Sequence, residues 1–194
     1  MSMINSELIH LVAFNDAAET AQMLFKLTEA NREYLRSWLP WLDGVQAVED
    51  SQQFLRTCLE SDARGDSLHL FIFYEDVCIG VINVRDIGQK HSDGKNINGI
   101  SAALGYWVAQ SHSGRGIATQ MAQKIIGLCK ASHAGTSRTL PLIDTLIIRC
   151  NPNNVASNAV AGKCGFLYSH TLPESENLYG QLSDLNVYYL PLSA

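Results

Sequence analysis

The 194 residues and 46% hydrophobic content suit one globular domain spanning 1–194, and they leave no room for a second domain of ordinary size. Fourteen basic against nineteen acidic residues give a formal net charge of −5. This balance argues against a nucleic-acid-binding surface and suits a basic or amine-bearing partner.

Signals for membranes, export, disulfides and metals are missing from the sequence. No apolar run reaches about 18 residues, and the first ten residues contain neither a basic region nor an apolar one. The five cysteines are scattered and form no Cys-x-x-Cys pair. We therefore expect a soluble cytoplasmic protein without membrane or metal sites, whose cysteines are small buried side chains.

The first half of the chain predicts helices between short β-strands. Asn15 or Asp16 is placed to cap a helix after the first strand, and Pro40 is expected to end or kink a later helix that begins near Glu29. Hydrophobic spacing of three to four residues marks helices, and β-rich runs mark strands. The predicted elements are strand 8–14, helix 17–27, a helix from about 29 to the proline, helix 51–63, and a hairpin of strands 67–75 and 77–84.

A polar segment rich in Gly, Asn, Asp and Ser follows at 85–99, and we expect a long exposed loop there. His91 lies in this segment and is expected to be solvated, whereas His69 lies on an apolar strand and is expected to be a hydrogen-bonded core histidine. Neither histidine is assigned a catalytic role.

The middle of the chain predicts a right-handed β-α-β unit. Its elements are strand 100–109, helix 119–134 and strand 142–150. The last of these is a nearly continuous apolar run, as expected of a strand buried on both faces and parallel to its neighbour.

The remaining segments predict a short helix and two closing strands. Asn153 or Asn154 is expected to cap the helix, and Gly165 is well placed just after its end. Strands are predicted at 166–171 and 185–190, with 173–184 between them. Antiparallel strands around one parallel unit indicate an α+β fold with a mixed sheet.

The most informative stretch is the turn Gly114-Arg115-Gly116 between a predicted strand and a predicted helix. Two glycines allow a tight backbone and close approach of a ligand, and the free amides at a helix start attract phosphate. Arg115 offers a charge-assisted bond. A plain strand-to-helix turn explains the same residues equally well, so the flanking sequence must decide.

Three nucleotide-type sites make different demands on that flanking sequence. A phosphate loop of the NTPase kind needs Gly-Lys followed by Ser or Thr, which is absent. A dinucleotide site needs a third small residue where Thr119 stands, and an acidic residue at the end of the next strand, which ends instead in Arg149-Cys150. The acetyltransferase type remains.

The turn resembles the pyrophosphate loop of the GCN5-related N-acetyltransferases (GNAT), in which Gln or Arg and two further residues precede Gly-x-Gly or Gly-x-Ala. The matching string here is 113–118, Ser-Gly-Arg-Gly-Ile-Ala, with Ser113 at the place of the usual Gln or Arg. The segment 151–166 resembles the second signature of the same family, Asn-x-x-Ser followed by Gly-Phe. The Asn-Arg and Trp-Leu-Pro-Trp strings at 31–41 resemble the RimL-like branch, which acetylates ribosomal proteins.

This resemblance implies the GNAT fold, a mostly antiparallel twisted sheet with helices on both faces, and acetyl-CoA as the acetyl donor. Main-chain groups at Trp107 and Val108 are expected to pair with the pantetheine arm, on a strand splayed by a bulge. The resemblance also implies that Trp38 and Trp41 line the acceptor side, although two tryptophans this close are more often core. The residues expected to hold the donor are Trp107, Val108, Ser113, Gly114, Arg115, Gly116, Ile117, Ala118, Thr119 and Asn154.

The resemblance further implies two catalytic side chains. Ser157 stands where RimL-like enzymes carry a serine that protonates the departing thiolate, and Glu176 stands where they carry the proposed base. A serine that bonds its own backbone explains Ser157 equally well, and Glu174 competes with Glu176.

The leading hypothesis is therefore an acetyl-CoA-dependent N-acetyltransferase that acts on the α-amino group of a protein N-terminus. Alternatives are an acetyltransferase of a small amine such as a polyamine or aminoglycoside, a CoA-binding sensor without catalysis, and, as an outsider, a dinucleotide-binding oxidoreductase. The resemblance also allows a homodimer.

Overall fold

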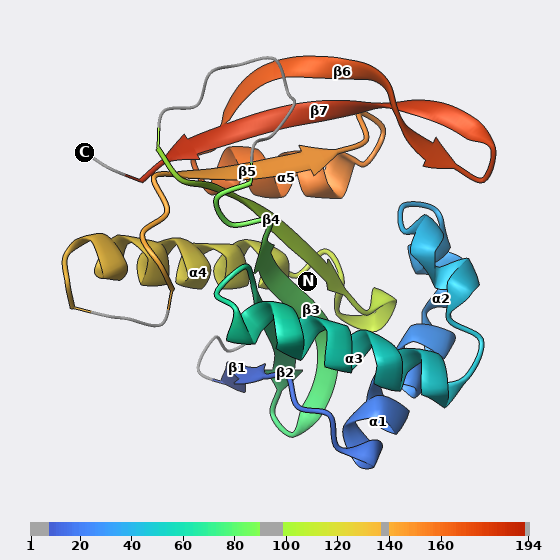
Figure 1. Ribbon diagram of the computed structural model, residues 1–194. Coiled ribbons are helices and arrows are strands. Elements are labelled where there is room, and N and C mark those ends of the chain that lie inside the picture. Colours follow the sequence, from blue (N-terminus) through green and yellow to red (C-terminus); the bar gives the residue numbers. More distant parts are fainter. Residues whose placement is uncertain (1–7, 90–98, 137–139, 193–194) are drawn as a thin grey trace.

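The computed structural model describes residues 8–89, 99–136 and 140–192. In these residues the strands form one seven-stranded sheet in the order β1-β2-β3-β4-β5-β7-β6, and the only parallel pair within it is β4 and β5 (Figure 1). The strands are β1 (Ile9–Ala13), β2 (Leu68–Tyr74), β3 (Val77–Arg85), β4 (Ser101–Val108), β5 (Thr145–Cys150), β6 (Leu167–Leu178) and β7 (Gln181–Pro191). The predicted α+β class and the parallel unit are confirmed.

Helices cover both faces of the sheet, because alternate side chains of the central strands are apolar on each side. The α-helices are α1 (Ala18–Ala30), α2 (Arg32–Arg36), α3 (Val48–Ala63), α4 (Ile117–His133) and α5 (Val155–Lys163). On one face, Phe71 and Val81 pack with Leu24 of α1 and Leu55 of α3. The opposite face packs against α4 and α5 in a larger cluster that includes Ile82, Leu146, Met121, Ile125 and Val160.

The parallel strands β4 and β5 separate before they end. Pairing joins Ser101–Ala103 to Thr145–Ile147 and stops there, although β4 continues to Val108 and β5 to Cys150. The register of β4 with β3 is unbroken over the same residues, so the expected bulge in β4 is not observed. The sheet therefore opens on the β5 side of β4, and the main chain there is left without a strand partner.

Gly80 of β3 allows the end of β4, near Trp107 and Val108, to stay closely paired with β3. A Cβ atom at position 80 would lie 2.3 Å from the carbonyl oxygen of Trp107, which no real side chain tolerates. Glycine is therefore required at the point where β4 turns away from β5.

The prediction that 173–184 separates two short strands is wrong. Strands β6 and β7 run through it and meet at a turn formed by Tyr179 and Gly180, both with positive φ. A register shift between Leu172 and Glu176 bends β6 within this hairpin. Much of the hairpin is exposed and therefore polar, and a polar composition of this kind is also typical of a loop.

Other predictions differ only at element ends. The predicted cap at Asn15 or Asp16 is wrong, since the N-cap of α1 is Ala17 and no side chain caps this helix. Asn15 lies just before the helix and accepts hydrogen bonds from the Ala17 amide and the Thr20 hydroxyl. Pro40 begins a short 3-10 helix, η2 (Pro40–Gly44), after α2 has ended. Helix α4 begins at Ile117, two residues before the predicted start.

The core role of His69 is confirmed, since its ring is buried and its Nδ1 lies 2.7 Å from Asp62 Oδ1. The predicted 85–99 loop is described only at its ends, with Arg85 inside β3, and His91 lies outside the described residues. In the described part of the chain, no helix is both long and apolar enough to span a bilayer.

Candidate active site

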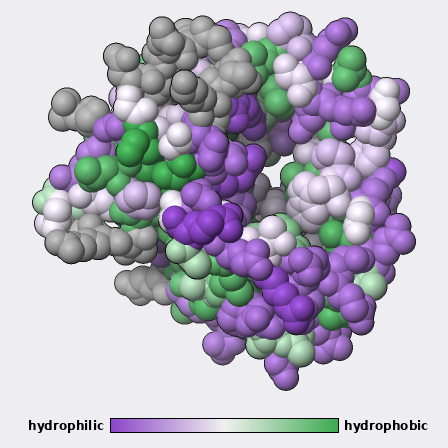
Figure 2. Space-filling view, in the orientation of Figure 1, coloured by the Kyte–Doolittle hydropathy of each residue, from purple (hydrophilic) through white to green (hydrophobic). Residues whose placement is uncertain are grey.

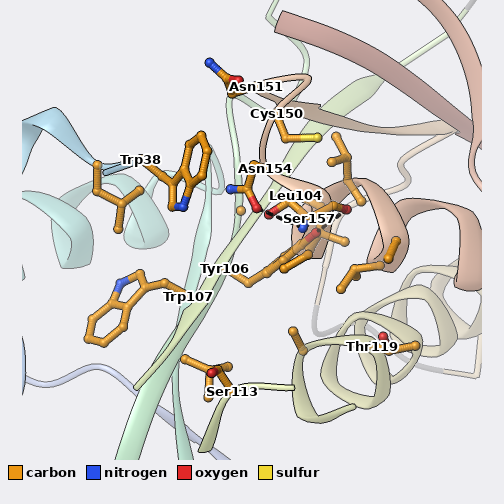
Figure 3. Close-up of a pocket in the computed structure, with 18 of the residues that line it drawn as sticks. Trp38, Leu104, Tyr106, Trp107, Ser113, Thr119, Cys150, Asn151, Asn154 and Ser157 are labelled. Atoms are coloured by element: carbon orange, nitrogen blue, oxygen red, sulfur yellow. Dashed lines mark hydrogen bonds between the residues drawn. The ribbon is translucent and has the colours of Figure 1, made fainter. Parts of the chain in front are cut away.

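A cavity of about 610 Å³ occupies the opening between β4 and β5 and reaches both faces of the sheet (Figure 3). One end is lined by the start of α4, and the other by α2 and the residues that follow it. The surface is hollowed between the β6–β7 hairpin and α2 (Figure 2). The site therefore has room for two molecules that meet near the splayed end of β4.

The glycine turn leads into the cavity in a conformation that favours glycine. Gly114 and Gly116 have φ values of 70° and 81°, in the left-handed region, and Gly116 is the N-cap of α4. No side chain caps this helix start among the described residues. The first amides of α4 are thus left to a ligand, and their partial positive charge favours an anion.

Most of the predicted donor-binding residues line this cavity. Those from the turn and helix start are Ser113, Gly114, Gly116, Ile117, Ala118 and Thr119, and those from β4 and α5 are Trp107, Val108 and Asn154. Arg115 is exposed and is not among the lining residues. Ser113 donates its hydroxyl to the Gln110 carbonyl at 3.0 Å, so its side chain stabilises the preceding turn.

Ser157 lies at the start of α5 and faces the same cavity. The side chain of Asn154 accepts a hydrogen bond from the Ser157 amide at 3.1 Å, which confirms Asn154 as the helix cap. Tyr106 of β4 donates its hydroxyl to the Ser157 carbonyl at 3.3 Å, and burial raises the pKa of this phenol. In the described residues, the amide and the carbonyl of Ser157 are both hydrogen-bonded, and its hydroxyl is close enough to the Tyr106 hydroxyl to lower the pKa of that phenol against the larger effect of burial.

Of the two glutamates considered, only Glu176 lines the cavity. It is half-buried on β6, and burial raises the pKa of its carboxyl above the usual value. Glu174 is exposed with a φ of 51°, and its amide donates to Asp184 at 3.0 Å. The bend in β6 thus turns one glutamate inward and leaves the other in solvent.

Residues 9–167 match the model of the acetyltransferase (GNAT) domain. The chain belongs to the GNAT family of acetyltransferases. The predicted GNAT fold is confirmed, and the cavity at the splayed strands is the candidate active site of this GNAT enzyme.

Proteins similar to this GNAT chain include ribosomal-protein acetyltransferases and acetyltransferases whose structures contain CoA or acetyl-CoA. The ribosomal-protein-serine acetyltransferase of Escherichia coli K12 is 31% identical over 180 residues, which cover 93% of this chain and 89% of that protein. The structure of RimL, a ribosomal L7/L12 α-N-protein acetyltransferase in complex with coenzyme A, has a TM-score of 0.80, 25% identity and 98% coverage of both chains. The microcin C7 self-immunity acetyltransferase MccE, in complex with acetyl-CoA and AMP, has a TM-score of 0.80, 27% identity and coverage of 96% and 93%.

The two tryptophans expected on the acceptor side of the GNAT site are separated in the structure. Trp38 lines the cavity and lies opposite Asn154 across it (Figure 3). Trp41 does not line this cavity; its side chain is 45% exposed, and its ring is parallel to that of Phe54.

Several lining residues of the GNAT site were missed by the sequence analysis. Tyr106 directly precedes Trp107 and Val108, the predicted main-chain contacts on β4, and this position in the sequence could have indicated that it lines the cavity. Asn151 follows β5 directly, is buried, and donates to the Ser183 hydroxyl while accepting from the Asn153 amide. These bonds hold the loop before α5 against β7 and so set the position of Ser157.

Cys150 also lines the GNAT cavity, but its chemistry is unsuited to attack on a thioester. Burial raises the pKa of its thiol to about 11, so the nucleophilic thiolate is scarce at neutral pH. No group of three His, Cys, Asp or Glu side chains able to hold a metal is found in the described residues.

Proposed function

We propose that this GNAT acetyltransferase transfers the acetyl group of acetyl-CoA to the α-amino group of a protein N-terminus, of the ribosomal-protein type. The observation that carries the proposal is one cavity lined by the α4 glycine turn, the freed edge of β4, Ser157 and Glu176. The relatives support the acceptor class, since both the E. coli enzyme and RimL act on ribosomal proteins.

The donor end of the cavity fits a pyrophosphate and an extended amide-bearing arm. Uncapped amides at Gly116 and the first turn of α4 suit the phosphates, and left-handed glycines keep side chains away from them. Main-chain groups of Trp107 and Val108, beyond the pairing with β5, are available for the pantetheine amides. When bound, acetyl-CoA supplies an acyl thioester.

Glu176 is proposed as the base that takes the amine proton, directly or through one water molecule. An α-amino group has a pKa of about 8 and is partly deprotonated at neutral pH, so a carboxylate with a raised pKa is a sufficient acceptor. The amine attacks in its neutral form, and its nitrogen passes one proton to Glu176 as it bonds to the thioester carbonyl carbon. Main-chain donors at Trp107 and Val108 are proposed to stabilise the oxyanion that forms.

Ser157 is proposed as the acid that completes the transfer. As the tetrahedral intermediate collapses, the carbon–sulfur bond breaks, and the Ser157 hydroxyl donates a proton to the thiolate. The proton lost by Ser157 is restored from solvent. The place of Ser157 in the cavity lining and the bond from the Tyr106 hydroxyl to its main chain, which holds the residue in place, support this role.

Acetyl transfer from acetyl-CoA to a panel of acceptors, followed by mass spectrometry, tests this function. N-terminal peptides of ribosomal proteins should gain one acetyl group on the α-amine. Polyamines and aminoglycosides should react at least tenfold more slowly. Turnover of the small amines alone would contradict the proposed acceptor, and CoA binding without any transfer would point to a sensor.

A further inference from the structure

The side chain of Asn158 is the centre of a hydrogen-bond network beside the active site. It lies near the start of α5 and does not line the catalytic cavity. Its amide nitrogen donates to the main-chain oxygens of Asn151 and Asn154, at 2.9 and 2.8 Å. Its amide oxygen accepts from the Asn186 side-chain amide at 2.9 Å and from the Tyr188 hydroxyl at 2.6 Å. These four bonds match the two donors and two lone pairs of the side chain.

The orientation of the Asn158 amide follows from its partners. Main-chain oxygens only accept hydrogen bonds, so the amide nitrogen must face the loop before α5, and the amide oxygen must face β7. Side chains of a helix lean toward its N-terminus, which brings a short amide at this position over the preceding loop. Asn158 is therefore a fixed connection between that loop and β7.

The β7 end of the network is anchored in turn by β6. The amide oxygen of Asn186 accepts from the Thr171 hydroxyl at 2.8 Å. Thr171 and Asn186 also stand opposite each other in the ladder of β6 and β7. A partner of Asn158 is thus held both by strand pairing and by a side-chain bond, and a supported partner fixes the position of the side chain that contacts it.

A second contact joins the same loop to β7 at the level of Glu176. Asn151 donates its side-chain amide to the Ser183 hydroxyl. Ser183 stands directly opposite Glu176 in the ladder, and side chains that are directly opposite lie on the same face of an antiparallel pair. Ser157 of α5 and Glu176 of β6 both line the cavity. The network therefore connects the two elements that carry them.

We propose that Asn158 is a positioning residue for acetyl transfer, which fixes Ser157, the proposed acid, relative to Glu176, the proposed base. The proposal rests on the function proposed above. Proton transfer requires hydrogen-bond distance between its partners, so a displacement of about 1 Å slows it strongly. Without the Asn158 amide, main-chain oxygens of the loop lose a donor, and the start of α5 is released from β7.

Replacement of Asn158 should slow the chemical step without weakening acceptor binding. At saturating acetyl-CoA, Asn158→Ala should lower kcat by about 10- to 100-fold and leave KM for an N-terminal peptide within about twofold of wild type. Asn153→Ala is the matched control, because Asn153 is an exposed asparagine of the same loop and does not line the cavity. Its kcat should equal that of wild type. A rise in KM larger than the fall in kcat would overturn the proposal, since it would indicate general loosening of the acceptor side.

A double-mutant cycle determines whether Asn158 acts through Ser157. Ser157→Ala removes the proposed acid, so a further change of Asn158 to alanine should then lower kcat by less than about twofold. Equal losses from Asn158→Ala with and without the Ser157 hydroxyl would overturn the positioning role alone. Unchanged kcat in Ser157→Ala would instead contradict the acid role of Ser157, and the positioning role would fall with it.

Tyr188→Phe is a milder variant for the case in which Asn158→Ala does not fold. It removes one hydrogen bond to Asn158 and keeps the ring, and it should lower kcat by about 2- to 10-fold in wild type and hardly at all beside Ser157→Ala. Circular dichroism at the assay temperature verifies that each variant is folded. Wild-type kcat in a folded Asn158→Ala variant, or in Tyr188→Phe where the former does not fold, would overturn the proposal.

Discussion

Tyr179 donates its hydroxyl hydrogen to the main-chain oxygen of Arg36 at 2.8 Å, and the Arg36 guanidinium lies 4.0 Å from the centre of the Tyr179 ring. This contact joins the tip of the β6–β7 hairpin to the end of α2. Glu176 lies on β6 and Trp38 follows α2, and both line the catalytic cavity. The Tyr179–Arg36 contact therefore links two walls of this cavity, although the two residues are more than 140 positions apart in the sequence.

Loss of this link should affect the acceptor more than the donor. Tyr179→Ala removes the hydrogen bond and the cation–π contact, and we expect KM for an acceptor peptide to rise by about 3- to 10-fold, with KM for acetyl-CoA unchanged. Tyr179→Phe keeps the ring and should have a smaller effect. Tyr168→Phe, at an exposed tyrosine elsewhere on β6, is the matched control. A rise in KM for acetyl-CoA alone would contradict the assignment of the two ends of the cavity.

Replacement of Glu176 should change the pH profile of the reaction. The base must be ionised and the amine neutral, so log kcat/KM should rise with pH with a slope of two below the raised pKa of Glu176 and of one between that pKa and the pKa of the amine. Glu176→Gln should lower kcat by about 10²-fold and leave a slope of one at all pH values below the pKa of the amine. Initial rates across a pH series measure this, and Glu174→Gln should behave as wild type.

The raised pKa of Glu176 also predicts that its carboxylate, although it speeds the reaction, makes the folded protein less stable at neutral pH. The pKa of Glu176 is higher in the folded protein than in the unfolded chain, so the free energy of unfolding falls as pH rises from the unfolded pKa through the folded pKa. Glu176→Gln should therefore leave Tm equal to wild type or higher at pH 7. A clear loss of Tm in this variant would indicate that the carboxylate is held by favourable contacts and is not strained by burial.

Replacement of Gly116 should weaken donor binding through the backbone. Open space surrounds its missing Cβ, so Gly116→Ala creates no clash, but φ of 81° is unfavourable for alanine by about 1 kcal/mol or more. We expect a rise in KM for acetyl-CoA together with a modest loss of Tm. Gly127→Ala, within α4 and also in open space, should raise Tm and leave KM unchanged, because alanine favours a helix interior.

Asp62 should stabilise the fold near neutral pH. Burial opposes its ionisation, but hydrogen bonds from the His69 ring, the Ser67 hydroxyl and the His69 amide outweigh it and lower the pKa of Asp62. Its contribution is present above the unfolded pKa and is lost as pH falls through the folded pKa. Asp62→Asn should cost about 1–2 kcal/mol in urea unfolding at pH 7, with a gap to wild type that narrows in acid.

Features that depend on neighbouring residues were predictable. Two glycines before a helix led directly to the turn at Gly114 and Gly116, because positive φ and uncapped amides are local backbone properties. The cap of α5 was narrowed to Asn153 or Asn154 for the same reason, and the structure selects Asn154. The order of strands and helices followed from hydrophobic spacing, with errors mainly at element ends.

Features that depend on distant residues were not predictable. Trp38 and Trp41 are close in sequence and similar in type, yet only Trp38 lines the catalytic cavity, because η2 directs Trp41 toward Phe54 of α3. The length of the closing hairpin was missed, and its strands were predicted only at 166–171 and 185–190, because the exposed parts of β6 and β7 show no strong apolar pattern.

The amino-acid sequence by itself indicated the family, the glycine turn before α4 and an asparagine cap for α5. The turn and the cap rest on short-range backbone geometry. Only the tertiary structure decided which glutamate and which tryptophan line the cavity, and where β4 leaves β5. Those outcomes depend on strand register and on packing between segments far apart in the chain. A shift of one residue in β6 would exchange the faces on which its side chains lie.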